Sequence, residues 1–302
     1  MFDPAFIKLT AQALGTDPSH IEKDWHVVRA LAVIAGIQVP GVTPVFSGGT
    51  SLAAAWRIIN RFSEDIDFKV VIDAPNPSAA RTRRSKFRES VIEALVQAGF
   101  ALDGDVLVGN MSRFFRASFH YRATLPPAAG IRPTLQLEMT FGGTLMEPAA
   151  HPVQSLLARA AKDPSEIASL MCVDPVETAA DKIGALAWRT AVRDRKSSKD
   201  DPSIVRHIHD LAALAPVVEG SATFAPLARN VLAQDAGRTK IAGADGLALL
   251  RAMLPAITGD PQWRDEYERF VEAVSFGPDA DRIGFDNAIA ACGSLVSRVL
   301  AS

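Results

Sequence analysis

The hydrophobic pattern changes near residue 150, and this change restricts the possible folds more than any other feature of the chain. Before it, three short runs between residues 100 and 141 alternate apolar and polar side chains, as strands do. After it, Ala- and Leu-rich stretches with helical spacing follow one another to the end. We therefore predict an α+β domain over 1–150 and an all-helical domain over 151–302.

Composition narrows the class of protein. Of the 302 residues, 48% are hydrophobic and 22% are charged, which predicts a soluble globular protein with a sizeable core. The net charge of −2 gives no overall attraction to nucleic acid, so any such contact must come from local patches. The two cysteines, Cys172 and Cys292, lie in apolar surroundings and are expected to be buried thiols rather than a disulfide.

Targeting signals are not visible in the sequence. The first residues have neither the basic nor the apolar segment of a signal peptide, and no apolar run approaches the ~20 residues of a membrane span. We therefore expect a cytoplasmic protein without a membrane partner.

Two acids stand one residue apart at the start of a predicted strand. Alternation places Asp65 and Asp67 on one face, with Ile66 and Phe68 on the core face. Carboxylates about 7 Å apart on one face repel each other unless they reach solvent or share a cation. Because oxygen ligands suit Mg²⁺ or Mn²⁺, the pair indicates a metal site. Ordinary surface acids at a strand end are the alternative.

A turn of small residues precedes these acids and consists of Ser47, Gly48, Gly49, Thr50 and Ser51. Its glycines let the backbone approach a ligand, and a helix is predicted to begin at its end. A helix N-terminus offers free N–H groups and partial positive charge, which suit a phosphate. Alone, the turn could equally be unliganded. Combined with the acid pair, it favours metal-assisted attack on a nucleoside triphosphate.

Polar residues further along the chain could join this site. Glu138 lies on the polar face of a predicted strand that could pair beside Asp65 and Asp67, although it could also be a solvent-facing acid. Lys182 lies on a predicted helix over 177–193 in line with two arginines, a stripe that could face phosphates or solvent. The basic cluster over 81–88 and the polar loop over 193–199 are candidates for an RNA backbone or simply solvated charge.

The segments Phe46-Ser-Gly-Gly-Thr-Ser-Leu and Arg61-Phe-Ser-Glu-Asp-Ile-Asp resemble the AbiEii/AbiGii nucleotidyltransferase toxin family, which includes the MenT-type toxins of mycobacteria. The helix around Lys182 and the segment 206–211 are similar to later motifs of that family, and 22–25 resembles its N-terminal signature. The resemblance covers about 20–215. It implies a polymerase β-type nucleotidyltransferase core with a mixed sheet, followed by an all-helical C-terminal lobe.

The resemblance also implies a role for each candidate residue. The turn from Ser47 to Ser51 would hold the triphosphate, and Asp65, Asp67 and Glu138 would bind the metal. Lys182 would contact the nucleotide phosphates. Asp210 would orient Lys182 or the incoming substrate. One departure is His207, which stands where relatives commonly have Asp.

The function implied is that of a metal-dependent nucleotidyltransferase toxin of a toxin–antitoxin or abortive-infection system. It would transfer an NMP from an NTP to an acceptor, expected to be the tRNA 3′ end, with release of pyrophosphate. A cognate antitoxin protein would be its partner. Two alternatives fit the same residues: transfer to a protein or a small molecule, and a non-catalytic regulatory protein that binds a nucleotide.

Overall fold

The computed structural model describes the chain except for residues 1–2, 129–130, 242, 279–281 and 302. It contains two compact units. The N-terminal unit comprises Met1–Val173 and Phe276–Pro278, and the C-terminal unit comprises Asp174–Ser275 and Asp279–Ser302. The predicted combination of an α+β part with a mixed sheet and a helical C-terminal part is confirmed.

One seven-stranded sheet organises the N-terminal unit, with the strand order β3-β4-β5-β2-β1-β7-β6. The strands are β1 (Val42–Ser47), β2 (Asp65–Ile72), β3 (Ala101–Gly109), β4 (Phe114–His120), β5 (Thr134–Thr140), β6 (Ala149–Val153) and β7 (Ile167–Cys172). β2 is parallel to β5 and β1 is parallel to β7, whereas the other neighbours are antiparallel. The sheet is therefore mixed, and β5 is placed beside β2 although β3 and β4 lie between them in the chain.

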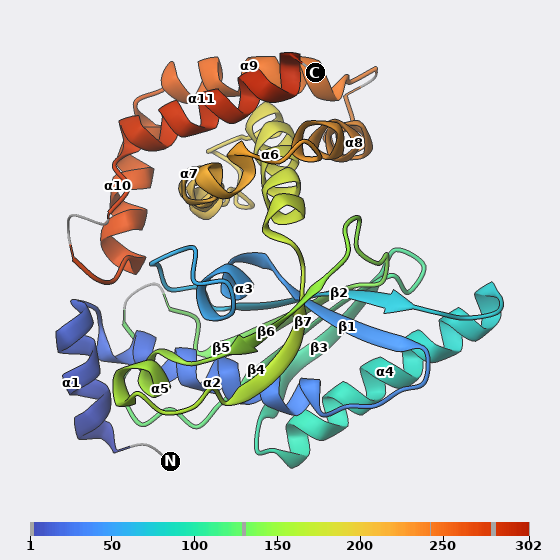
Figure 1. The fold of residues 1–302 in the computed structure, drawn as a ribbon, viewed down its shortest axis with the longest axis vertical. Coiled ribbons are helices and arrows are strands. Elements are labelled where there is room, and N and C mark those ends of the chain that lie inside the picture. Colours follow the sequence, from blue (N-terminus) through green and yellow to red (C-terminus); the bar gives the residue numbers. More distant parts are fainter. Residues whose placement is uncertain (1–2, 129–130, 242, 279–281, 302) are drawn as a thin grey trace. The chain divides into compact units, whose positions relative to one another are not determined.

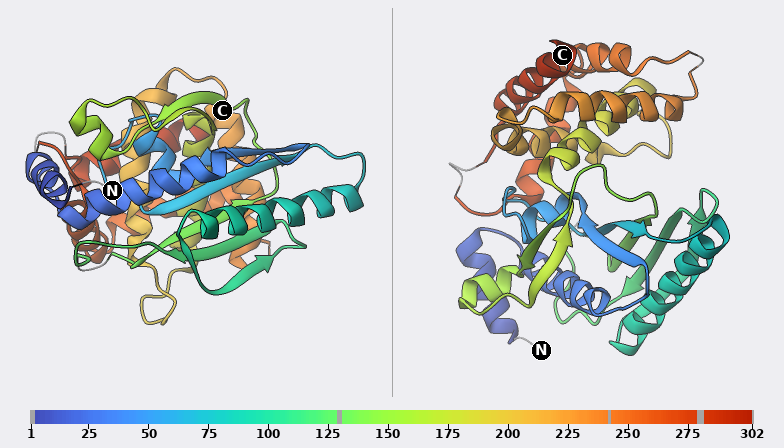
Figure 2. Two further views of the ribbon diagram at one scale, coloured as in Figure 1. Left: turned by 90° about the horizontal axis from the view of Figure 1, so that it is seen from below. Right: turned by 45° about the vertical axis from the view of Figure 1, so that its right-hand side comes forward.

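Helices cover one face of this sheet. The helices of the unit are α1 (Pro4–Leu14), α2 (Pro18–Ala35), α3 (Gly48–Ala54), α4 (Pro77–Gln97) and α5 (Leu156–Ala161). Figures 1 and 2 show α2 and α4 along the same face. Leu31 of α2 and Phe87 of α4 are fully buried in one core with Ile66, Phe68 and Val70 of β2. Because side chains alternate along a strand, the acids of β2 lie on the other face.

Capping residues set where the two core helices begin. Asp17 accepts a hydrogen bond from the N–H of Ser19 at the start of α2. Asn76 accepts one from the N–H of Ala79 at the start of α4. Both helices also have proline in the first turn, where its missing N–H has no partner to lose.

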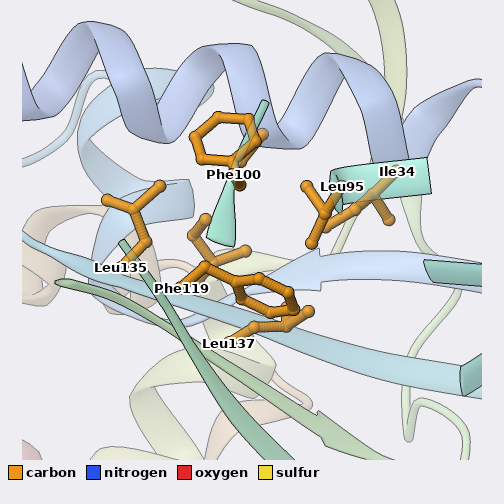
Figure 3. Close-up of a pocket in the computed structure, with 8 residues that line it drawn as sticks. Ile34, Leu95, Phe100, Phe119, Leu135 and Leu137 are labelled. Atoms are coloured by element: carbon orange, nitrogen blue, oxygen red, sulfur yellow. The ribbon is translucent and has the colours of Figure 1, made fainter. Parts of the chain in front are cut away.

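The core contains a small apolar pocket between α2, α4 and the sheet (Figure 3). It is lined by Ala30, Ile34, Ile66, Leu95, Phe100, Phe119, Leu135 and Leu137. None of these lining side chains can hydrogen-bond to a phosphate. The pocket is thus a feature of core packing, on the sheet face opposite to the acids of β2.

A second apolar cluster joins α1, α2 and α5 to a segment from much later in the chain. Phe276 packs with Ile7, Ile21 and Leu157. Its backbone N–H donates to the backbone oxygen of Asn60 at 3.1 Å. These contacts place Phe276–Pro278 in the N-terminal unit, although residues of the C-terminal unit precede and follow it in sequence.

Helices form the described part of the C-terminal unit. They are α6 (Pro175–Val192), α7 (Arg206–Glu219), α8 (Phe224–Ala236), α9 (Gly246–Thr258), α10 (Gln262–Val274) and α11 (Phe285–Ala301), with short 3-10 helices η1 (Pro202–Val205) and η2 (Gly237–Thr239). α6 packs against α7, α8 and α9. Gly184 allows the close approach of α8, because a Cβ atom there would lie 2.7 Å from Cγ1 of Val231.

The N-terminal unit extends past residue 150, where the sequence predicts a boundary. β6 and β7 follow that position, and β7 pairs with β1 through Phe46 and Cys172. These strands have only five and six residues, so their alternation was too short to stand out beside the helical pattern that follows. Cys172 and Cys292 are buried free thiols, as expected.

Candidate active site

Aligned residues on four adjacent strands form a polar row across the sheet. Asp67 of β2 lies opposite Ser47 of β1 on one side and opposite Glu138 of β5 on the other. Glu138 in turn lies opposite Arg116 of β4. Residues directly opposite each other project from the same face of a sheet. Asp65 lies on this face too, opposite Gln136, so the structure gathers the three predicted acids on one face.

Arginine side chains contact Asp65 and Glu138. Asp65 pairs with Arg132, which precedes β5. Glu138 accepts hydrogen bonds through Oε1 from Nε of Arg116 at 2.8 Å and from Nε2 of Gln136 at 2.6 Å. The face therefore combines carboxylates with fixed positive charge.

The residues of this face suit a metal ion whose coordination is completed by the substrate. In the described part of the chain, no group of three or more His, Cys, Asp or Glu side chains is arranged to hold a metal ion. Mg²⁺, however, is usually bound by one or two carboxylates together with water and substrate phosphates. Asp65 and Asp67 offer two carboxylates on one face, and this donor set fits such an ion. Glu138 is held by Arg116 and Gln136.

The glycine turn presses against the acids. Gly48 has a φ of 75°, and a Cβ atom there would overlap the carboxylate of Asp67. A Cβ atom at Gly49 would lie 2.7 Å from Nη2 of Arg61 and 2.9 Å from Oγ of Ser63. Gly48 is therefore required for the close packing of α3 against β2, and Gly49 for its packing against the segment just before β2, whether or not a ligand binds.

Hydroxyl groups attach the turn to β2. Oγ1 of Thr50 donates to the backbone oxygen of Asp65 and lies 3.1 Å from Oγ of Ser63, from which it can accept. Thr50 and Ser51 are each only 2% exposed, and the side chain of Ser47 makes no capping hydrogen bond. A ligand would thus meet the backbone N–H groups that begin α3 rather than these hydroxyls.

Sequence reasoning missed a charged network next to Asp65. Lys23 of α2 is fully buried, and its ammonium lies 2.5 Å from Oε2 of Glu64. Glu64 also accepts from Nε of Arg132 at 2.8 Å. A signal was present, because 22–24 places three consecutive charges in a helix whose other residues are mostly apolar.

The neighbours of Lys23 are buried as well and fasten loops to α2. Glu22 accepts from the N–H of Thr124 at 2.7 Å, and Asp24 accepts from the N–H of Leu156 at 2.6 Å. The segment 22–25, which resembles a family signature, therefore serves to hold loops of the N-terminal unit together.

A buried ion pair links α6 and α7 within the C-terminal unit. Nζ of Lys182 lies 2.6 Å from Oδ2 of Asp210, with the two side chains 9% and 0% exposed. Nδ1 of His209 lies 3.3 Å from the other carboxylate oxygen of Asp210. The structure thus brings together Lys182 and Asp210, which the sequence suggested as partners.

His207, the departure from the family pattern, lies on α7 together with Asp210. Both of its ring nitrogens are buried, and neither has a hydrogen-bond partner among the residues that the structure describes. Burial, reinforced by the charge of Lys182, lowers the pKa of His207 well below its usual value. The ring is therefore neutral at neutral pH and cannot replace the charge of an aspartate.

The polar loop after α6 is tied into its own unit. Arg193 is 6% exposed and pairs with Asp200 at 2.9 Å and with Glu266 at 2.8 Å. Its guanidinium also stacks over Trp263, 4.5 Å from the ring centroid. These contacts pair the charge of Arg193, one of the cations of the loop that the sequence offered for an RNA backbone.

The mixed sheet, the acids at the start of β2 and the glycine turn that opens α3 lie together in one part of the N-terminal unit. The family model that matches residues 40–291 is described as "Nucleotidyl transferase AbiEii toxin, Type IV TA system". The chain belongs to this family and is a nucleotidyltransferase toxin of the type IV toxin–antitoxin class.

Two further comparisons complete this result. Among solved structures, MenT4, a nucleotidyltransferase toxin from Mycobacterium tuberculosis H37Rv, is similar over 100% of this chain and 99% of its own, with 18% identity and a TM-score of 0.49. No curated protein matches the chain. Within the described residues, no helix is long and apolar enough to cross a membrane.

Proposed function

We propose that the chain transfers an NMP from an NTP to the 3′ end of tRNA and releases pyrophosphate, with Mg²⁺ or Mn²⁺ as the metal. The observation that carries the proposal is the alignment of Asp67 with Ser47 and Glu138, beside Asp65 and against Gly48. It sets carboxylates next to the N-terminus of α3, the two features that a metal-bound triphosphate needs.

The chain's own residues would divide the work between the acids and the turn. Asp65 and Asp67 bind the metal, with Glu138 as a third acid. The metal, when bound, supplies charge stabilisation for the transferred phosphate. The turn from Gly48 to Ser51 binds the triphosphate through backbone N–H groups at the start of α3.

Lys182 and Asp210 would act on the nucleotide and the incoming substrate. Lys182 contacts the phosphates, and Asp210 holds the ammonium in place through their 2.6 Å pair. Support for this role comes from the pairing itself, since the carboxylate of Asp210 fixes where the ammonium of Lys182 lies.

Labelled NTPs, Mg²⁺ and total tRNA provide the direct test with the full chain. Labelled tRNA is expected, with the label at the 3′ end when the products are sequenced. Asp65→Asn and Asp67→Asn should each lower the rate at least about a hundredfold, because each removes a charge next to the metal. Asp105→Asn, at an exposed position of β3, is the matched control and should keep full activity.

The acceptor is decided in the same experiment by adding protein and small-molecule fractions in place of tRNA. If only those fractions become labelled, the acceptor is a protein or a small molecule and not tRNA. Nucleotide binding without turnover in any fraction would favour a regulatory protein. An Asp65→Asn protein that is as active as the wild type would refute the proposed site.

A further inference from the structure

Arg132 joins Asp65 to the charged network beneath it. Its guanidinium pairs with the carboxylate of Asp65, and its Nε donates to Oε1 of Glu64 at 2.8 Å. Its Nη1 donates to Oε1 of Gln136 at 2.7 Å. Arg132 stands just before β5 and Asp65 begins β2, so the pair bridges the starts of two parallel neighbouring strands.

Lys23 fixes this arrangement from α2. Its side chain is fully buried, and it donates to the backbone oxygen of Arg132 at 2.7 Å as well as to Glu64. A buried ammonium is tolerated only when it is paired and hydrogen-bonded. Lys23 therefore holds both the backbone of Arg132 and the carboxylate that aligns its guanidinium.

The guanidinium of Arg132 would repel a metal ion bound at Asp65. A divalent cation bound by Asp65 would lie close to the guanidinium of Arg132, and like charges at short range repel. Arginine does not lose its proton in proteins, so deprotonation cannot relieve the repulsion. A triphosphate can, because it brings negative charge and because the planar guanidinium binds phosphate oxygens as well as it binds a carboxylate.

We infer that Arg132 couples metal binding at Asp65 to triphosphate binding. This inference rests on the function proposed above. Without ligands, Arg132 neutralises Asp65. Once Asp65 is occupied, the guanidinium turns to a phosphate oxygen of the NTP while Glu64 continues to hold its Nε. Metal and triphosphate then bind together, and metal alone binds weakly.

Mn²⁺ binding to the purified full chain, measured by electron paramagnetic resonance, tests the coupling. In the wild type, a non-hydrolysable NTP analogue should tighten Mn²⁺ binding by about tenfold or more. In Arg132→Gln, Mn²⁺ alone should bind about tenfold more tightly than in the wild type, and the analogue should add little. Arg132→Lys keeps the charge and should retain part of the coupling.

Arg113→Gln is the matched control, because Arg113 is an exposed arginine just before β4 and outside the network. It should behave as the wild type does. A thermal unfolding curve for each variant separates altered binding from loss of the fold. If Arg132→Gln does not fold, Arg132→Lys still decides, since a reduced effect of the analogue is expected there.

Two results would overturn the inference and differ in what else they overturn. If Arg132→Gln binds Mn²⁺ alone no more tightly than the wild type, the coupling is refuted and the proposed function stands. If the wild type and Asp65→Asn bind Mn²⁺ equally in the presence of the analogue, the proposed metal site is wrong and the inference is lost with it.

Discussion

Lys182 and Asp210 form a buried pair across helices α6 and α7, with Nζ 2.6 Å from Oδ2. Removing one member takes away an opposite charge that directly contacts the other in the core. We expect Asp210→Leu and Lys182→Met each to lower the free energy of unfolding by about 3–5 kcal/mol. The double variant should be less destabilised than the sum of the two, because it removes both charges from the core.

Urea unfolding of the four proteins measures this coupling. A double variant whose loss equals the sum of the single losses would show that the pair contributes nothing jointly. Activity assays on the same proteins separate the structural role of the pair from catalysis. If Lys182 contacts phosphate, all three variants lose activity, even though the double variant loses less stability than the sum of the single variants.

Gly48→Ala should damage both stability and activity. Alanine is strained at a φ of 75°, at about 1–2 kcal/mol, and its Cβ would also overlap the carboxylate of Asp67. Gly143→Ala is the matched control, because Gly143 has a φ of 78° but no neighbouring atom within 4 Å of a Cβ. In urea unfolding, the free energy of unfolding of both variants should fall by about the strain energy. Only Gly48→Ala should lose activity. Equal activity would mean that Asp67 adjusts without consequence.

His26 should make the protein less stable in mild acid. Burial lowers the pKa of His26 to about 4. The unfolded chain therefore binds a proton near pH 6.5 that the folded chain does not bind until about pH 4. The stability that depends on neutral His26 is fully present above pH 6.5 and is lost as the pH falls through about 4. The free energy of unfolding should fall by up to about 3 kcal/mol over this range. His26→Phe, which keeps a ring beside Tyr121, should remove this slope from urea midpoints between pH 7.5 and 4.5.

Asp24 should act in the opposite direction over nearly the same range. Burial raises the pKa of Asp24 to about 6. The stability that the protonated carboxyl contributes is fully present below the unfolded pKa near 3.8. It is lost as the pH rises through about 6, which lowers the free energy of unfolding by up to about 3 kcal/mol. Asp24→Asn keeps an oxygen that can accept from the N–H of Leu156. It should therefore be more stable than the wild type at pH 7.5 and similar at pH 4; equal stability at pH 7.5 would contradict the raised pKa.

Alternation alone placed the acids of β2 correctly. Ile66 and Phe68 are apolar and buried, so Asp65 and Asp67 had to share the other face. The neighbouring position of Glu138 could be suggested only as one option, because strand pairing between β2 and β5 is not local information. Whether these residues carry the predicted roles stays a prediction.

The charged network under Asp65 was beyond the reach of sequence patterns. Lys23 and Glu64 stand 41 residues apart, and Arg132 and Asp65 stand 67 apart. Periodicity assigns a charged side chain to the solvent face. Lys23 is buried instead, because Glu64 and the backbone oxygen of Arg132 pair with its ammonium inside the protein. The short strands β6 and β7 were missed for a different reason, since five or six residues give too few alternations.

The return of the chain at Phe276 has a consequence for how this protein can be divided or recombined. A fragment that ends at Val173 keeps every strand of the sheet but lacks the side chain that packs with Ile7, Ile21 and Leu157. The N-terminal unit is therefore discontinuous as a coding segment, and a genetic exchange at residue 173 would separate α1 and α5 from part of their own core. Residues 276–278 must therefore be supplied together with the first 173 residues for this apolar cluster to be complete.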